Sequence, residues 1–189
     1  HKIMKNFFHH TEESKRSPFE DGLRTPILFR WDKQITPARH ELLCSSVDIA
    51  PTLLHLMGQS KKAKDLPGIN LLDADVRKRN ADRAVFGEIY PGDATSLGHP
   101  SRDIAYRWVR QGNFKFIVPQ GNKPWGNYLN QPALFNLAKD PYEKKNLHLR
   151  ASSRTHAKAM RRLLENWWQP GNDDAVPKPP ANGLDETQH

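Results

Sequence analysis

Apolar residues at helical spacing mark two segments of the chain. Between Val47 and Met57 the apolar residues fall at positions 49, 50, 53, 54 and 57, which places them along one side of a helix. Asp48 is the expected N-cap of this helix and Gly58 its expected stop. A second stripe covers positions 157, 160, 163, 164, 167 and 168. The spacing therefore predicts helices over 47–57 and 155–168, the second amphipathic and packed on a sheet.

Shorter apolar runs predict strands. The run from Thr25 to Trp31 is apolar, partly β-branched or aromatic, and contains a proline near its start, which predicts a buried strand. Further along, Gln111-Gly112-Asn113 separates two apolar runs as the turn of a hairpin does. In the second of these runs Phe114, Phe116 and Val118 alternate with Lys115 and Ile117, as expected of a sheet with one buried face. The predicted strands are 25–31, 84–90, 105–110, 114–118 and 133–137.

The order of these elements predicts a division of the chain. Residues 61–83 are charged and rich in turn formers apart from the apolar stretch 66–72, so we place a boundary there. The part before this stretch would form a strand-and-helix unit, and the part after it an antiparallel sheet closed by a helix. Residues 171–189 offer almost nothing to bury and are expected to be disordered.

Charge and composition narrow the function classes. The chain has 189 residues, 29 Lys plus Arg and 21 Asp plus Glu, for a net charge of +8. Much of the excess lies in one cluster: Arg150, Arg154, Lys158, Arg161 and Arg162. A solvated helix face explains such a cluster, and with no nucleic-acid module motif we expect no nucleic-acid partner. No apolar run approaches the roughly 18 residues of a membrane span, so we expect no membrane partner.

Cysteine and histidine give no complete active site. Cys44 is the single cysteine, which excludes an internal disulfide, and its apolar surroundings predict a buried thiol rather than a nucleophile. His9 and His10 are adjacent and would point apart in either a helix or a strand. The other histidines lack the spacing of metal ligands, so we expect no metal site built from this chain alone.

The segment from Lys15 to Pro26 is the strongest candidate for function. Pro18 and Gly22 bend it, Glu20 can pair with Arg24 or accept backbone N–H groups, and Lys15 precedes the bend, where an ammonium group can meet an anion. Loops at the end of a buried strand often carry functional groups in α/β proteins. A solvated basic loop is the alternative.

Five blocks of the sequence resemble the sulfatase family. Residues 15–26 resemble its pattern of a lysine, a spacer, an aromatic residue and Glu-Gly-Gly-x-Arg-x-Pro. Residues 46–58 are similar to its Asp-x-x-Pro-Thr-Leu-Leu helix, and 66–72 to the stretch that follows. Residues 109–117 and 133–147 resemble its Arg-x-Gly-x-x-Lys hairpin and its Asp-Pro, Glu, Asn-Leu ending. The resemblance covers Ser14 to about Trp168.

The resemblance implies a fold and a role for Lys15. The fold would be α/β: residues 1–72 would end an alkaline-phosphatase-like catalytic domain, and 73–170 would form the small antiparallel sheet with its closing helix. Lys15 matches the catalytic lysine that binds the sulfate oxygens, as an ammonium group with three donors can. Asp21 stands where the family has glycine, and aspartate tolerates left-handed backbone better than most residues.

The family's other catalytic groups have no counterpart in the sequence. The resemblance implies a formylglycine nucleophile, made in a Cys/Ser-x-Pro/Ala-x-Arg motif, and a calcium ion. The sequence after Cys44 lacks the proline and arginine of that motif, and Phe8 to Glu13 does not match the Asp-Asn-Gly-like metal motif. We therefore expect a C-terminal fragment of a sulfatase that is inactive alone.

Several alternatives stay open. By resemblance the substrate would be a sulfated small molecule or glycan, and the location periplasmic or secreted. A related phosphatase, phosphodiesterase or phosphonate hydrolase would share the fold, and a basic module could bind polyanions through Arg161 and Arg162. The loop 90–102, with Asp93, His99 and Arg102, could line a substrate site, although a plain surface loop is the expectation. No motif addresses the oligomeric state.

Overall fold

A four-stranded antiparallel sheet forms the centre of the molecule. The computed structural model describes residues 16–120 and 128–171. Its strands are β1 (Ala84–Ile89), β2 (Tyr106–Gln111), β3 (Phe114–Pro119) and β4 (Ala133–Asn136), which pair in sequence order. Gly112, at a φ of 53°, helps to turn β2 into β3. The four strands predicted over 84–137 are confirmed.

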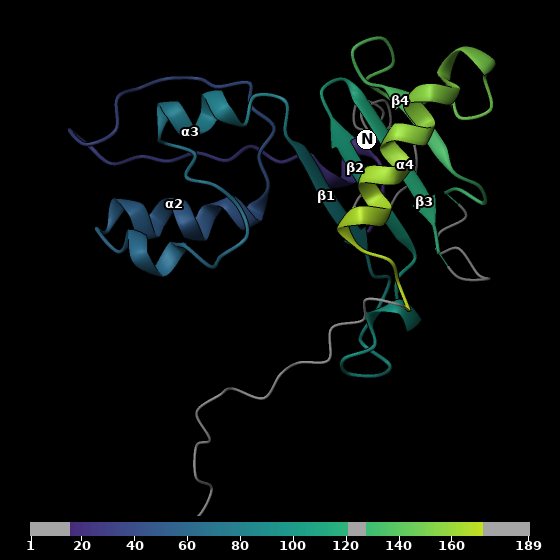
Figure 1. Ribbon diagram of the computed structural model, residues 1–189, viewed down its shortest axis with the longest axis horizontal. Helices are drawn as coiled ribbons and strands as arrows, with labels where there is room; N and C mark the ends of the chain where they lie inside the picture. The colour runs from purple at the N-terminus through teal and green to yellow at the C-terminus, as the bar shows by residue number, and fades with distance from the viewer. Residues whose placement is uncertain (1–15, 121–127, 172–189) are drawn as a thin grey trace, which may run out of the picture.

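One face of the sheet is covered by the closing helix. Helix α4 (Arg154–Trp167) lies across this face in Figure 1. Its buried residues Ala157, Met160 and Leu164 pack with Val109 of β2 and Phe116 of β3 in one apolar cluster. The predicted amphipathic helix and its packing on a sheet are confirmed.

The opposite face of the sheet is covered as well. Phe19, which comes about 90 residues before β2 in sequence, packs there with Tyr106, Ile117 and Phe135, and in Figure 1 the purple N-terminal segment passes behind the strands. Lys115 points to this face and is completely buried. The prediction of a sheet with one buried face is therefore wrong, because the alternation within a strand does not show which distant segment covers its polar side.

A second group of elements surrounds helix α2 (Ile49–Leu56), which a short 3-10 turn (Ser46–Asp48) precedes. Helix α3 (Ala74–Arg79) and a 3-10 turn (Ser60–Ala63) lie near α2 in Figure 1. The helix predicted over 47–57 is confirmed, and Gly58 follows its end at a φ of 70°.

Asp48 stands at the predicted N-cap position of α2, but its side chain makes no capping hydrogen bond to that helix. Its fully buried carboxylate accepts hydrogen bonds from the backbone N–H groups of Ser45 and Ile69, both at 2.8 Å. It also accepts bonds from Arg83, at 2.8 Å from Nη1 and 3.1 Å from Nη2. Because Arg83 directly precedes β1, this ion pair ties α2 to the start of the sheet.

Thr52 adds a second connection between α2 and the stretch 66–72. Its hydroxyl donates to the carbonyl oxygen of Asp48 at 2.6 Å and accepts from the backbone N–H of Leu71 at 3.0 Å. The aspartate and threonine of the Asp-x-x-Pro-Thr motif thus hold the following block in place. Two of the five sequence blocks form one structural unit.

Gly68 allows this unit to close, and its replacement tests the packing. Gly68 has a φ of 97°, and a Cβ atom there would lie 2.5 Å from the Val47 carbonyl oxygen and 2.8 Å from Asp48 Oδ1. We expect Gly68→Ala to lower the free energy of unfolding by about 2–4 kcal/mol, because it adds backbone strain to overpacking. Urea unfolding measures this.

Gly92→Ala is the matched control. No atom would lie within 4 Å of its Cβ, and its φ is not in the left-handed region. A change below about 0.5 kcal/mol is expected. Equal stability of the two variants would show that residue 68 does not approach residues 47 and 48 closely in solution.

Residues 25–31 do not form the predicted buried strand. They belong to no strand or helix, and Leu28 is 89% exposed and Trp31 47% exposed. A strand needs a paired strand to satisfy its backbone groups, and within 16–120 and 128–171 no strand pairs with this segment. The apolar pattern is real, but the described part of the chain does not cover it.

The predicted division at residue 72 remains a prediction. Figure 1 shows α2, α3 and residues 24–44 on one side of the molecule, and the sheet with α4 on the other. The segment 16–23 nevertheless packs on the sheet, so contacts cross the predicted boundary. Residues 172–189, nearly all of the predicted disordered tail, lie outside the described residues.

Candidate functional site

Lys15 lies just outside the described residues, but the segment that follows it is firmly packed. Ser17 and Phe19 are 1% and 2% exposed. The Ser17 hydroxyl accepts from the Phe19 backbone N–H at 3.2 Å and donates to Asp21 at 3.3 Å. Asp21 belongs to the short helix α1 (Glu20–Leu23), so the residue that replaces the family's glycine needs no left-handed backbone. Arg16 adopts it instead, at a φ of 73°.

Glu20 is held by charged groups from the sheet. Its side chain lies 2.7 Å from Arg110 Nη1 and 3.1 Å from Lys115 Nζ. Its backbone N–H donates to Glu143 at 2.6 Å, and Glu143 in turn lies 2.9 Å from Lys115 Nζ. We call Glu20, Arg110, Lys115 and Glu143 the buried ion cluster. The side chain of Glu20 was predicted to accept backbone N–H groups or to pair with Arg24, but it pairs with Arg110 and Lys115 instead.

The buried ion cluster is electrically balanced. It contains two carboxylates and two cations, and the side chains of Lys115 and Glu143 are 0% and 2% exposed. Burial raises the pKa of the Glu143 carboxyl, and the Lys115 ammonium opposes this shift only in part. Trp108 adds a ring whose centroid lies 5.9 Å from Lys115 Nζ. With no charge in excess, the cluster is suited to holding segments together rather than to binding an anion.

The buried ion cluster joins three of the sequence blocks. These contacts were not predicted from the sequence. Glu20 comes from the first block, Arg110 and Lys115 are the arginine and lysine of the Arg-x-Gly-x-x-Lys hairpin, and Glu143 follows Asp140-Pro141 in the last block. The available signal was the presence of charged residues at fixed motif positions. Lys115 was the clearest of these, since it alternates with core residues of β3.

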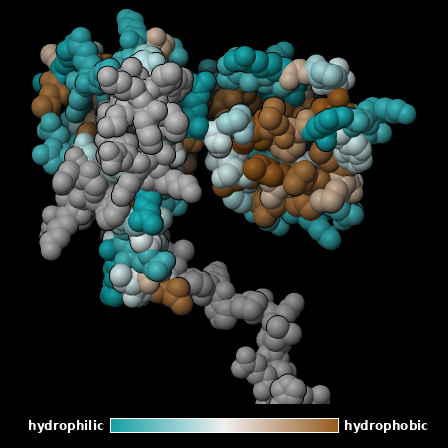
Figure 2. Space-filling model, turned by 180° about the vertical axis from the view of Figure 1, so that it is seen from behind, coloured by the Kyte–Doolittle hydropathy of each residue, from teal (hydrophilic) through white to brown (hydrophobic). Residues whose placement is uncertain are grey.

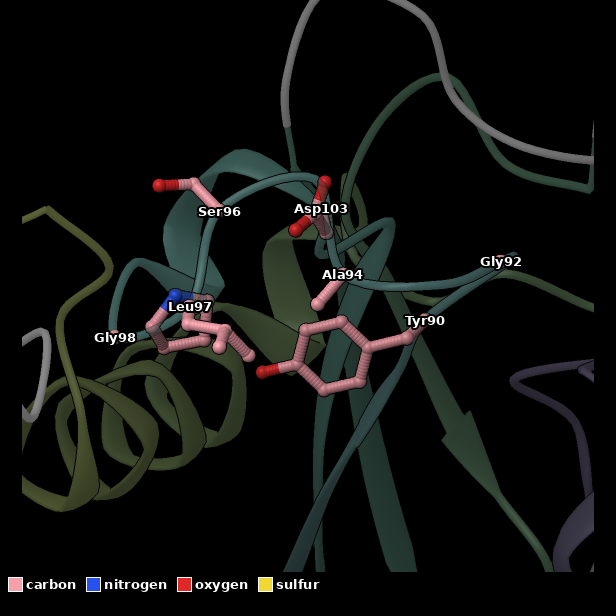
Figure 3. A pocket seen from close by; sticks show the side chains of 8 residues that line it. Tyr90, Gly92, Ala94, Ser96, Leu97, Gly98 and Asp103 are labelled. Atoms are coloured by element: carbon pink, nitrogen blue, oxygen red, sulfur yellow. The ribbon is translucent and has the colours of Figure 1, made fainter. Parts of the chain in front are cut away.

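The loop between β1 and β2 encloses a small hollow of about 280 Å³. Figure 3 shows the Tyr90 ring beside Leu97 and Ala94. Asp103 accepts hydrogen bonds from the Thr95 hydroxyl at 2.6 Å and backbone N–H at 2.8 Å, and these bonds lower the pKa of its carboxyl. The residues predicted as a possible rim, Asp93, His99 and Arg102, do not line this hollow. Its lining residues are Tyr90, Gly92, Ala94, Ser96, Leu97, Gly98, Pro100 and Asp103.

Cys44 is exposed, so the prediction of a buried thiol is wrong. It lies in the connection before α2, which other described residues cover only in part. The pKa of the Cys44 thiol is raised, mainly by its partial burial and to a smaller extent by the negative charge of Asp48. A raised pKa disfavours the thiolate form that a nucleophile needs. Among residues 16–120 and 128–171, no three His, Cys, Asp or Glu side chains gather as metal ligands.

The basic residues of α4 are spread over its surface. Arg161 lies over the Phe116 ring, 5.3 Å from its centroid, and 3.6 Å from Glu165, whereas Arg154, Lys158 and Arg162 are exposed.

Across the part of the chain that the structure describes, no helix is long and apolar enough to cross a bilayer.

Comparison with known proteins gives a consistent family. The sequence model of one protein family, described as the C-terminal region of N-sulphoglucosamine sulphohydrolase, matches residues 9–169. An ulvan-active sulfatase of Formosa agariphila is 26% identical over 182 residues, covering 82% of this chain and 34% of the relative. Human N-acetylgalactosamine-6-sulfatase is 27% identical over 148 residues, covering 69% of this chain and 27% of the relative. The chain thus spans about a third of the length of these relatives.

Solved structures support the same fold. A structure from work on the metabolism of multiple glycosaminoglycans by Bacteroides thetaiotaomicron superposes with a TM-score of 0.56 at 22% identity, covering 81% of this chain and 31% of that one. A Bacteroides fragilis protein described as a sulfatase gives a TM-score of 0.54 at 22% identity, covering 76% and 29%. The expected end of an alkaline-phosphatase-like fold, with its antiparallel sheet and C-terminal helix, is confirmed. The chain belongs to the sulfatases, in the family of the N-sulphoglucosamine sulphohydrolase C-terminal region.

Proposed function

We propose that this chain acts as the C-terminal part of a sulfatase that hydrolyses sulfate esters. The activity proposed is the one in the names of its relatives: an ulvan-active sulfatase, an endo-4-O-sulfatase and an N-acetylgalactosamine-6-sulfatase. Two of these names specify a sulfated glycan or amino sugar, so the proposed substrate class is a sulfated sugar or glycan. An exported location, periplasmic or secreted, belongs to the same proposal.

The activity rests on the family match over residues 9–169, and the structural observation that supports a larger catalytic unit is the apolar segment before α2, which belongs to no sheet of the described residues. Residues 24–44, apart from Gln34 and Leu43, border a hollow of about 1230 Å³ whose other side includes Leu71, Leu72 and Arg77. Figure 2 shows a broad apolar area on this part of the molecule. Between residues 24 and 72 the exposed large apolar side chains are Leu28, Trp31, Val47, Leu53, Met57 and Leu66. An apolar area of this kind is typical of an interface, and the proposed occupant is an N-terminal α/β part whose sheet pairs with residues 25–31.

The proposed chemical contribution of this chain is the ammonium group of Lys15. A lysine supplies three donors and a positive charge to the sulfate oxygens, on which negative charge shifts as the sulfur–oxygen bond breaks. The described residues offer neither a calcium ligand set nor a formylglycine motif. We therefore assign the nucleophile and the calcium ion that the resemblance implies to the N-terminal part.

Turnover of two matched esters tests the proposal. The test uses the polypeptide that the gene encodes, with the proposed α/β part before this chain, and we call it the extended enzyme. We expect it to hydrolyse p-nitrophenyl sulfate faster than p-nitrophenyl phosphate, and the 189-residue chain alone to hydrolyse neither. A preference for phosphate would instead support a phosphatase or phosphodiesterase.

A further inference from the structure

Glu20 of the buried ion cluster comes five residues after Lys15 in the chain. Residue 15 is two peptide units from Ser17, so its Cα lies within about 7.6 Å of the Ser17 Cα. From Ser17 to Glu20 the chain is fixed by burial, with the Phe19 ring 6.0 Å from the Phe135 ring. Whatever fixes residues 17–20 on the sheet therefore limits where the side chain of residue 15 begins.

The cluster fixes this segment through rigid elements. Lys115 lies within β3, which is paired on both sides by β2 and β4, and Arg110 lies on the neighbouring strand β2. Glu143 accepts the backbone N–H of Glu20 as well as contacting Lys115. Main chain and side chain of Glu20 are thus both held, which sets the direction of the segment as well as its distance from the sheet.

Stability alone does not explain four charged groups at this place. Apolar side chains of similar volume usually stabilise a buried site as well as an ion pair does, because burial removes the charges from water. The surrounding residues are apolar and include Phe19, Ile117 and Phe135. The hydrogen bonds from Arg110 to the Glu20 side chain and from the Glu20 backbone N–H to Glu143 are directional, unlike apolar contacts. They therefore fix one arrangement of the segment among several that would bury Phe19.

We propose that Glu20, Arg110, Lys115 and Glu143 are positioning residues for Lys15, holding its segment so that its ammonium group meets the sulfate ester. This inference rests on the proposed function. A displacement of about 1 Å at a reacting group can cost a hundredfold in rate. In this proposal no member of the cluster touches the substrate, so the cluster affects catalysis only through Lys15.

A double-mutant cycle in the extended enzyme tests this dependence. Glu143→Gln keeps the size of the side chain and removes one charge. We expect it to lower kcat/KM for p-nitrophenyl sulfate by about ten- to a hundredfold. In a Lys15→Ala background the same substitution should change kcat/KM by less than about twofold, because the group that it positions is absent.

Met160→Ala is the control for general destabilisation. Met160 is buried in α4 on the opposite face of the sheet, so its truncation should lower the Tm without changing kcat/KM of the folded enzyme. If Glu143→Gln does not fold, Arg110→Gln replaces it in the same cycle, since the Arg110 side chain is 25% exposed. It is expected to show the same dependence on Lys15.

The outcomes separate the two proposals. An equal loss from Glu143→Gln or Arg110→Gln with Lys15 present and absent would overturn the positioning role and leave the proposed function intact. No loss from either cluster substitution in the wild-type background would do the same. No loss from Lys15→Ala itself would overturn the sulfate contact, and the positioning role with it.

Discussion

Lys15→Ala in the extended enzyme is expected to lower kcat/KM for p-nitrophenyl sulfate by about 10²–10³-fold. This is the range observed when one donor to a developing negative charge is removed from a preorganised site. The effect should appear in kcat as well as in KM, because the charge on the sulfate oxygens changes during the reaction. Steady-state kinetics over a range of substrate concentrations separates the two.

Lys158→Ala is the matched control for this substitution. Lys158 is exposed on α4, and its loss removes the same charge from the enzyme. Its kcat/KM should stay within about twofold of the wild-type value, since an exposed charge interacts weakly with a distant ester. A larger loss from Lys158→Ala than from Lys15→Ala would favour the alternative of a basic surface that binds polyanions.

Asp48→Ala is expected to give the largest loss of stability, about 3–5 kcal/mol in the free energy of unfolding. The substitution leaves the Arg83 guanidinium, whose side chain is 15% exposed, without its ion partner. It also removes the acceptor for the backbone N–H groups of Ser45 and Ile69. Urea unfolding of the chain, followed by tryptophan fluorescence, measures the change.

Asp32→Ala controls for the loss of an aspartate that forms an ion pair. Asp32 Oδ1 lies 2.9 Å from Arg30 Nε, but the side chains are 73% and 87% exposed. Such pairs contribute little, so the expected change is below about 1 kcal/mol. If both variants unfolded at the same urea concentration, the ion pair between Asp48 and Arg83 would not be part of the folded protein.

Local patterns in the sequence predicted most of the regular elements. The helices containing Leu53 and Leu164 and the hairpin around Gly112 follow from spacing and turn chemistry within about ten residues. The wrong predictions concern which distant segment covers a given strand. Residues 25–31 have the apolar composition of a buried strand without a partner in the described structure, and Lys115 was placed on an open face that Phe19 and its neighbours cover.

The contacts of the buried ion cluster could not be predicted from the sequence, for the same reason, and the role of Lys15 stays a prediction. The resemblance identified the block that contains Lys15 and Glu20 and the hairpin that contains Lys115. It did not predict that Glu20 contacts this hairpin. Glu20 is 90 residues from Arg110 and 123 residues from Glu143 in sequence, and no periodicity connects such distances. For Asp48 only the N-cap position was predicted. Its contacts with Ile69 and Arg83 were not, because these partners lie 21 and 35 residues away.

The contact between Lys15 and the sulfate group is the central claim, and one distance tests it most directly. The measurement is a crystal structure of the extended enzyme with an aryl sulfate bound under conditions that prevent turnover. We predict a separation of about 2.7–2.9 Å between Lys15 Nζ and a sulfate oxygen, the length of a hydrogen bond between charged groups. A bound ester with Lys15 Nζ pointing away, separated from every sulfate oxygen by more than about 6 Å, would contradict the account.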